Sequence, residues 1–459
     1  MLFVAVVLIL TVKSALKSDQ ISNQKFTTIS VSAQTLLNVR DFGAVGDGKT
    51  DDAAAFQKAL DAAATSDSQV VSVPRGNYRF EGSLNVPDGV TLKGVWESVP
   101  SHVGIRNKGQ VKPTDDGTTF LVTAGHGQLK ETPFLTLNSN STLKGVCIYY
   151  PDQKEDDIPV EYPVTIAMRG KNPAILDCEL LNPYQAIDAT KNERHLIRNI
   201  SGQPLRLGVY VDSIYDIGRI ENVHFNPWWS IKPKLFRWQM ENGEAFVFGR
   251  SDWQYVHNTF CFGYNVGYRF IETKNGVCNG NFSGIGADDC YTAVVVDQSA
   301  PMGLLITNGE FVSFHGQDPT MVRVNNKNHG TVRFSNCAFW GPCRQIAVTD
   351  GQGTVGFSDC TFVQWGFKDK EIGQTNDNDG GLSGLPEEKE RVETPAIQTF
   401  GGNLIIRGCE FQDKMPQVLI GENVRKAIVI GNLIRGEERI ENKAGEKSGI
   451  IIRDNVSGN

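Results

Sequence analysis

The sequence lacks several features that mark common classes of protein. After its first dozen residues it has no apolar run long enough to cross a bilayer, so we expect no membrane span beyond that point. It has no CxxC pair and no group of His and Cys with zinc-site spacing, so we expect no metal site. Its net charge of −7 argues against a phosphate-binding surface, and we expect no nucleic-acid partner.

Cysteine is also scarce. Nine cysteines in 459 residues are too few for a fold held together by disulfides, and the odd number leaves at least one thiol unpaired within the chain. Apolar residues are sufficient, at 40%, to bury a large core, which excludes a disordered chain.

The one strongly apolar run, LFVAVVLIL, lies at residues 2–10. It is too short to span a bilayer and resembles the core of a secretory signal. Small residues that suit cleavage stand at 31–33 and at 13–15. We therefore predict a signal peptide and leader over residues 1–36, and a protein that is secreted, at the cell surface or periplasmic. The alternatives are a misassigned start and a retained anchor.

A short pattern recurs along the rest of the chain. An apolar residue and a spacer precede Asn, Asp or Gly, and a small residue, a spacer and an apolar residue follow. The clearest copies are IENVHF (220–225), ITNGEF (306–311), FSNCAF (334–339), FSDCTF (357–362) and IRGCEF (406–411). A second alternating or β-branched segment accompanies most copies, as short strands do.

The repeat is too short for strand–helix–strand units. Two pairs of copies are 23 residues apart, at 334 and 357 and at 406 and 429, whereas a βαβ unit needs about 30 residues or more. Coils of a parallel β-solenoid fit this period, because each strand then pairs with its copy in the next coil. The recurring cysteines at 178, 337, 360 and 409 should form an internal row of buried thiols.

The repeat region opens with a distinctive segment, NVRDFGAVGDGKTDD at 38–52, which a helix-like stretch with one apolar face follows. With the later VPRGNYRF, this segment resembles the opening of pectate-lyase-superfamily proteins, which include polygalacturonases, rhamnogalacturonase- and epimerase-like proteins and phage tail spikes. The resemblance implies an all-β fold, a single-stranded right-handed parallel β-helix of the pectin-lyase type, over residues 37–459 with an N-terminal capping helix. It leaves the activity open, since such folds serve many functions.

Two stretches interrupt the coil period. About a dozen extra residues follow Phe225. Further along the chain, a polar, glycine-rich segment separates two later strands. We predict insertions near 226–244 and 366–394.

Tryptophan clusters around the first insertion. Trp228, Trp229 and Trp253 stand there with Arg250 in a chain that is acidic overall. Indole rings suit the apolar faces of sugars, and guanidinium groups suit their carboxylates. These four residues are therefore candidates for binding an acidic polysaccharide. The alternative is a hydrophobic cluster that holds the inserted loop on the wall of the helix.

A second candidate site follows in GADDCY (286–291) and SFHGQ (313–317). The order resembles the polygalacturonase layout, in which an Asp-Asp-Cys, a Gly-His-Gly and an Arg-Ile-Lys stand on successive coils. The resemblance implies catalytic roles for Asp288, Asp289 and His315 and a substrate-binding role for Arg344. The Asn-Thr-Asp of that family has no counterpart here.

The other chemistry available on this fold is β-elimination. It needs a cation, Ca²⁺ or Arg, to neutralise the uronate carboxylate and a base to remove the C5 proton, with Arg250, His257 and Lys274 as candidates. We expect no cofactor; if the protein is a lyase, Ca²⁺ is the alternative to an arginine as the neutralising cation.

The sequence thus favours an extracellular, carbohydrate-active enzyme that cuts an acidic, uronate-containing, pectin-like polysaccharide by glycosidic hydrolysis or β-elimination. The alternative is a non-catalytic polysaccharide-binding or surface β-helix of the tail-spike kind. The oligomeric state is left open.

Overall fold

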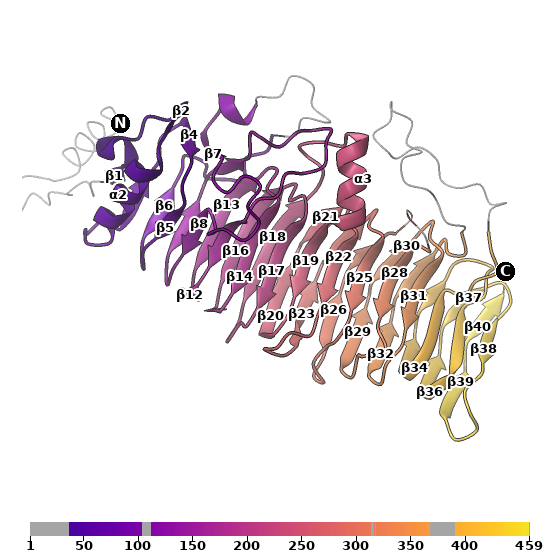
Figure 1. Cartoon of the computed structure of the whole chain (residues 1–459). Helices are drawn as coiled ribbons and strands as arrows, with labels where there is room; N and C mark the ends of the chain where they lie inside the picture. The colour runs from indigo at the N-terminus through magenta and orange to yellow at the C-terminus, as the bar shows by residue number, and fades with distance from the viewer. Residues whose placement is uncertain (1–35, 103–111, 314–315, 317, 368–390, 459) are drawn as a thin grey trace, which may run out of the picture. The chain divides into compact units, whose positions relative to one another are not determined.

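The structure, a computed structural model, describes residues 36–102, 112–313, 316, 318–367 and 391–458. Short strands succeed one another along the chain and pair in parallel with the equivalent strands of the coils before and after, as Figure 1 shows. Each full coil contributes one strand to each of three rows, which are visited in the order row 1, row 2, row 3. This arrangement is the right-handed parallel β-helix that the sequence predicts.

The three rows are defined by their pairings. Row 1 contains β5 (Leu84–Val86), β8 (Leu135–Leu137), β11 (Val164–Met168), β14 (Gln185–Thr190), β17 (Leu207–Asp212), β19 (Glu244–Phe248), β22 (Val266–Phe270), β25 (Thr292–Val296), β28 (Thr320–Val324), β31 (Gln345–Thr349), the first parts of β34 (Ile397–Arg407) and β36 (Val418–Ile430), and β38 (Ile440–Asn442).

Row 2 contains β1 (Leu37–Asn38), β3 (Val70–Ser72), β6 (Thr91–Lys93), β9 (Thr142–Lys144), the first parts of β13 (Ala174–Leu180), β16 (Leu196–Gly202) and β18 (Arg219–Phe225), then β20 (Ser251–His257), β23 (Cys278–Ser283), β26 (Leu304–Thr307), β29 (Thr331–Ser335), β32 (Thr354–Ser358), the second parts of β34 and β36, and β39 (Gly449–Arg453).

Row 3 contains β2 (Asp47–Asp51), β4 (Gly76–Phe80), β7 (Thr118–Val122), β10 (Cys147–Tyr149), the second parts of β13, β16 and β18, then β21 (Phe260–Phe262), β24 (Gly286–Asp288), β27 (Glu310–Phe311), β30 (Ala338–Trp340), β33 (Thr361–Val363), β35 (Glu410–Phe411), β37 (Leu433–Arg435) and β40 (Val456–Gly458). A separate pair, β12 (Gly170–Lys171) and β15 (Asn192–Glu193), lies between row 1 and row 2.

The recurring sequence pattern forms the corner of each coil, the turn between its strands in row 2 and row 3. Its central residue has a left-handed backbone, for example at Asn222 (φ 52°) and Asn336 (φ 52°). Asn, Asp and Gly tolerate this conformation better than other residues. Successive corners also bond to one another: the Asn222 amide donates to Asn199 at 2.9 Å, and the Asn336 amide to Asn308 at 2.7 Å. The repeat therefore encodes a turn.

Apolar side chains fill the inside of the coils. Because equivalent strands lie about 4.8 Å apart, equivalent rings stack, as Phe246 does on Tyr268 and Phe334 on Phe357, with centroids 4.9 and 5.2 Å apart. All nine cysteines are buried free thiols, which confirms the predicted internal row at 178, 337, 360 and 409.

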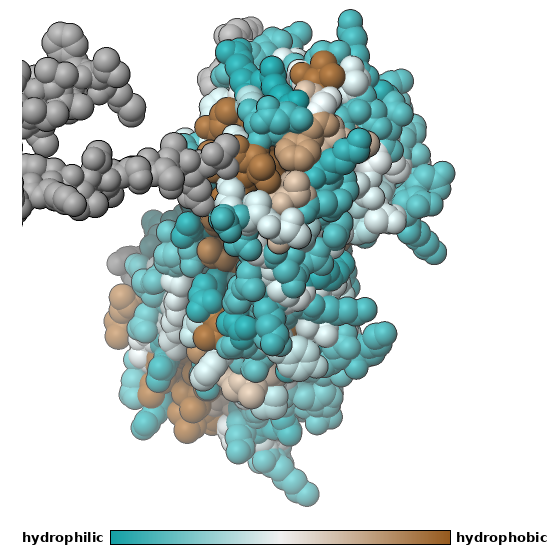
Figure 2. All heavy atoms as spheres, turned by 90° about the vertical axis from the view of Figure 1, so that its left-hand side faces the viewer, coloured by the Kyte–Doolittle hydropathy of each residue, from teal (hydrophilic) through white to brown (hydrophobic). Residues whose placement is uncertain are grey.

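The helix α2 (Ala53–Ala63) lies beside the first coils (Figure 1) and turns its apolar residues inward. Phe56 is fully buried and makes edge contacts with Tyr78, Phe80 and Phe120 at 4.9 to 5.6 Å between centroids. The molecular surface seen from this side is mostly hydrophilic, with apolar side chains in scattered patches (Figure 2). The contacts of Phe56 with the first coils suit the predicted role of α2 as a cap.

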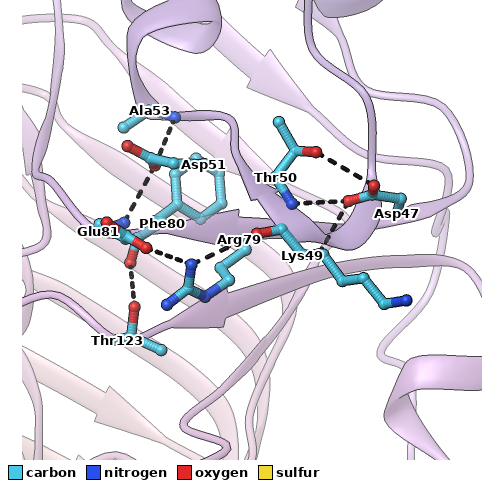
Figure 3. Close-up of polar contacts among 9 residues, drawn as sticks. All are labelled: Asp47, Lys49, Thr50, Asp51, Ala53, Arg79, Phe80, Glu81 and Thr123. Carbon is cyan, nitrogen blue, oxygen red and sulfur yellow. Dashed lines mark hydrogen bonds and ion pairs between the residues drawn. The ribbon is translucent and has the colours of Figure 1, made fainter.

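The acidic residues of the opening segment are structural, as Figure 3 shows. Asp47 accepts hydrogen bonds from the amides of Lys49 and Thr50, both at 2.8 Å. Asp51 accepts from the amides of Ala53 and Glu81, both at 3.1 Å, and so joins the start of α2 to the next coil. They form turns and a helix start.

Residues 226–243 form an excursion between β18 and β19 that contains the helix α3 (Pro233–Asn242). Most of the second predicted insertion, residues 368–390, lies outside the described residues. Among the described helices, none has the length and apolar character needed to cross a membrane.

Candidate functional site

Two concavities lie on the outer face of row 1. The first, of about 390 Å³, is lined over β14, β17, β19 and β22 by residues that include Tyr210, Arg206 and Arg269. The second, of about 400 Å³, is lined over β31 and β34 and includes Asp318 and Arg344. Row 1 continues through β25 and β28 between them, so the two concavities lie along one sheet face.

Ion pairs fix the arginines of the first concavity. Glu244 accepts from Arg206 at 3.4 Å and from Arg269 at 2.7 Å, and Arg269 also contacts Asp297 at 2.9 Å. Burial, followed by the charges of Asp212 and Asp188, raises the pKa of Tyr210 to about 12, so its hydroxyl keeps its proton and can donate. A guanidinium group has five N–H donors. An arginine that is paired with protein carboxylates therefore still has donors for the carboxylate of a ligand.

The turn that enters β25 carries the predicted acid pair. Asp288 ends β24, and Asp289 follows with a left-handed backbone (φ 50°) and only 2% exposure. Burial raises the pKa of Asp288 to about 6, and the charge of Asp289 is the second cause of this shift. A carboxyl group that holds a proton near neutral pH is what a general acid requires.

Tyr291 lies next to this pair. Its hydroxyl is buried and has no hydrogen-bond partner among the described residues. Burial, then the charges of Glu241 and Asp289, raise the tyrosine pKa above its usual value, while Arg237 lowers it. Arg237 and Glu241 belong to α3, so this helix contributes charge to the environment of the turn.

The helix α3 is held over the preceding turn. Phe236 stacks on Phe262 with centroids 6.3 Å apart, and Phe262 is the register partner of Asp288 in the next coil. Asn265 donates to the Glu241 carbonyl at 2.6 Å, and Gln239 to the Gly263 carbonyl at 3.1 Å. The excursion is therefore anchored one coil before the acid pair.

Arg344 directly precedes β31, two coils beyond the strand that follows Asp289. Its side chain contacts Asp318 at 3.7 Å. His315 lies outside the described residues, so its predicted catalytic role stays a prediction. Asp288, Asp289 and Arg344 thus stand at the same edge of row 1.

Trp228 and Trp229 belong to a small apolar cluster. Trp229 is 8% exposed and packs with Cys147, Leu181, Leu205 and Leu235, and Trp228 is packed against that group. Gln203 accepts from the Trp229 amide at 2.9 Å. This geometry favours the alternative in which both rings hold the excursion on the wall.

Arg250 stands at the opposite edge of row 1, in the turn that leads from β19 into β20. Trp253 lies within β20 of row 2, where the register with β23 is irregular. Trp253 is 58% exposed, with a left-handed backbone (φ 53°). Arg250 lies over the Tyr215 ring at 4.1 Å, and its amide donates to Asp212 at 2.8 Å. The predicted binding residues therefore fall on two edges, and their substrate-binding roles stay predictions.

We expect the two tryptophans to behave differently on truncation. Trp229→Ala should lower the free energy of unfolding by about 2–3 kcal/mol, because it opens a cavity in the cluster. Trp253→Ala should change it by less than about 0.5 kcal/mol, because the ring is exposed, and should weaken retention on polysaccharide. Urea unfolding and affinity electrophoresis measure the two effects. Equal stability losses would contradict this assignment.

The sequence analysis missed the arginines of the first concavity. Arg206 flanks β17 and Arg269 belongs to β22, strands that read as ordinary repeats, and their partners lie one coil away. The one signal was a charged residue within an apolar strand, as in YRFI at 268–271.

Two comparisons by sequence match part of the chain. Residues 36–119 match the family model "Rhamnogalacturonase A/epimerase, pectate lyase-like". A mannuronan C5-epimerase, AlgE2 of Azotobacter vinelandii, is 38% identical over 92 residues, 20% of this chain and 9% of the epimerase. Alginate lyase 7 of the same organism is 49% identical over 55 residues, 12% of this chain and 6% of the lyase. The chain thus covers less than a tenth of either relative.

Solved structures extend the likeness to most of the chain. A tailspike protein of E. coli bacteriophage HK620 has a TM-score of 0.55 at 8% identity, over 90% of this chain and 80% of the tailspike. The catalytic unit of a GH87 α-1,3-glucanase from Streptomyces thermodiastaticus has a TM-score of 0.51 at 12% identity, over 87% and 71%. At these identities the likeness concerns the fold. Together with the family match over residues 36–119, it supports a parallel β-helix fold of the pectate-lyase-like kind.

Proposed function

We propose that this protein is an extracellular enzyme that binds an acidic, uronate-containing polysaccharide along the outer face of row 1 and hydrolyses it, with Asp288 as the proton donor. One observation carries the proposal. A carboxyl group whose pKa is raised to about 6 lies in a turn between two concavities that contain arginines.

The spacing of these features suits an extended polymer. Arg269 in β22 and Arg344 before β31 are separated by three coil steps, or about 14 Å at the usual strand spacing. The acid pair enters the strand between them. A polysaccharide chain lying across the strands would place several sugar units over this distance, with carboxylates near both arginines.

Hydrolysis needs one carboxyl group as acid and a second as base or nucleophile. Asp288 provides the first, because it stays partly protonated near neutral pH, and Asp289 is the neighbouring candidate for the second. Tyr291 lies next to the pair, and its raised pKa keeps the buried hydroxyl protonated. Elimination would instead use an arginine or Ca²⁺ against the uronate carboxylate.

The relatives support the substrate class. Mannuronan and alginate, in the names of the matched epimerase and lyase, are uronate polymers. These matches cover 20% and 12% of this chain, so they support the class of ligand and do not reach a site for it.

An assay on purified protein separates the reactions. We expect polygalacturonate or alginate to yield new reducing ends without the ultraviolet absorbance of an unsaturated uronate, with no change on adding Ca²⁺ or a chelator. A neutral α-glucan is the control and should remain intact. Absorbance of unsaturated products would show a lyase. Binding without any product would show a non-catalytic binder and contradict the proposal.

A further inference from the structure

Three residues of types that bind metal ions form a cluster outside row 1. His102, Cys147 and Glu179 are all buried, and one ligand atom of each lies within 4.8 Å of the others. They come from three separate segments of the chain.

The coil register brings two of them together. Cys147 in β10 is the direct register partner of Glu179 in β13, in neighbouring coils of row 3. Both residues have fully buried side chains. The pairing follows from the fold itself, since register partners in adjacent strands lie about 4.8 Å apart.

The segment that follows β6 supplies the histidine. Gly94 donates to the Lys144 carbonyl in row 2 at 2.8 Å, and Ser201 in row 3 donates to the Pro100 carbonyl at 3.1 Å, so both ends of this segment are fixed to the coils. The His102 amide donates to one Glu179 oxygen at 2.8 Å, and its Nδ1 contacts the other. His102 therefore covers the Cys147–Glu179 pair.

The burial of this cluster has an electrostatic consequence. Burial first, and then the neighbouring Glu179 carboxylate, raise the pKa of Cys147 well above its usual value. A divalent cation reverses this, because it stabilises the thiolate and the carboxylate together.

We propose that His102, Cys147 and Glu179 bind one zinc ion. Imidazole, thiolate and carboxylate are the ligands that Zn²⁺ takes in proteins, at about 2.0–2.3 Å. Ligand atoms around a tetrahedral zinc ion are about 3.5 Å apart, so small side-chain adjustments within this cluster are sufficient. Three protein ligands leave a fourth position for water or an anion.

An open fourth position is typical of catalytic zinc, but all three residues of this cluster are buried, so we assign the site a structural role. It joins the segment after β6 to two coils of row 3, beside the cluster of Trp229 and Leu205 that also includes Cys147. Sequence spacing does not reveal it, because its ligands lie on different coils.

The full-length chain, purified without chelator and dialysed against Zn²⁺ or Co²⁺, provides the test. We expect about one metal per chain by elemental analysis, and with Co²⁺ a thiolate charge-transfer band that added Zn²⁺ abolishes. Chelation should lower the melting temperature. Cys147→Ser and His102→Gln should each remove the band and the bound metal. Cys178→Ser, the same substitution at another fully buried thiol in the core, is the matched control and should retain both.

Two results would overturn the site. One is a folded wild-type chain that takes up no metal from excess Zn²⁺ or Co²⁺. The other is a cobalt band that survives Cys147→Ser. Because the wild-type measurement needs no variant, misfolding of Cys147→Ser does not prevent a decision.

Discussion

Replacing Asp288 with asparagine should lower turnover of a polyuronate by about 10²- to 10⁴-fold, the usual contribution of a positioned general acid. The amide keeps the shape of the side chain but has no proton to transfer. Affinity for the polymer should change little, because the arginines of the two concavities remain. Initial rates of reducing-end release, together with equilibrium binding, measure both quantities.

The same substitution should stabilise the fold above pH 6. The folded-state pKa of Asp288 is raised from 3.8 to about 6, so the folded protein binds this proton more tightly than the unfolded chain. The stabilisation contributed by the protonated Asp288 is fully present below pH 4 and is lost as the pH rises through about 6. Asp288→Asn removes that loss, which has an upper limit of about 3 kcal/mol at pH 8. Urea unfolding at pH 4 and pH 8 measures the difference.

Asp359→Asn is the matched control, because it is the same substitution at an exposed aspartate, in the corner between β32 and β33. It should alter neither turnover nor the pH dependence of stability. For the wild type we expect kcat/KM to fall as the pH rises through about 6. Unchanged turnover by Asp288→Asn would exclude Asp288 as the acid.

The fold was predictable because each coil repeats the same local requirement. From β9 onward, each described corner between rows 2 and 3 has a residue with a left-handed backbone, such as Asn199 and Asn222 in adjacent coils, 23 residues apart. The apolar residues on either side must point inward. Both constraints act within six residues, so a single sequence shows them.

The excursion at 226–243 contains a helix, α3, that the sequence pattern did not indicate. Pro233 stands in the first turn of α3, and Leu235, Gln239 and Met240 form its buried side. Such a short amphipathic segment gains its stability from packing on the coil wall. That contact is not visible from the segment alone.

The candidate site could be predicted only in part. Asp288, Asp289 and Arg344 follow the order of a family motif, and the coil register brings them to one edge of row 1. The ion-paired Arg206 and Arg269, and the trio around Cys147, depend on which residues of different coils become register partners. Such neighbours are set by the exact length of each coil.

Phe56→Ala in α2 should lower the free energy of unfolding by about 3–5 kcal/mol, the usual cost of deleting a fully buried aromatic ring. The ring contacts Tyr78, Phe80 and Phe120, which belong to β4 and β7 in adjacent coils. In a solenoid each coil is stabilised by its neighbours, and the first coil has only one. The helix supplies the missing contact, so its loss should expose the first coils before the rest unfolds.

Urea unfolding and limited proteolysis measure these two effects, and early cleavage should fall between β2 and β7. Lys58→Ala, on the exposed side of the same helix, is the control and should change stability by less than about 0.5 kcal/mol. If Phe56→Ala costs less than about 1 kcal/mol, or if cleavage begins elsewhere, the first coils do not depend on α2. A large loss with early cleavage in this region would establish the helix as the cap of the coil stack.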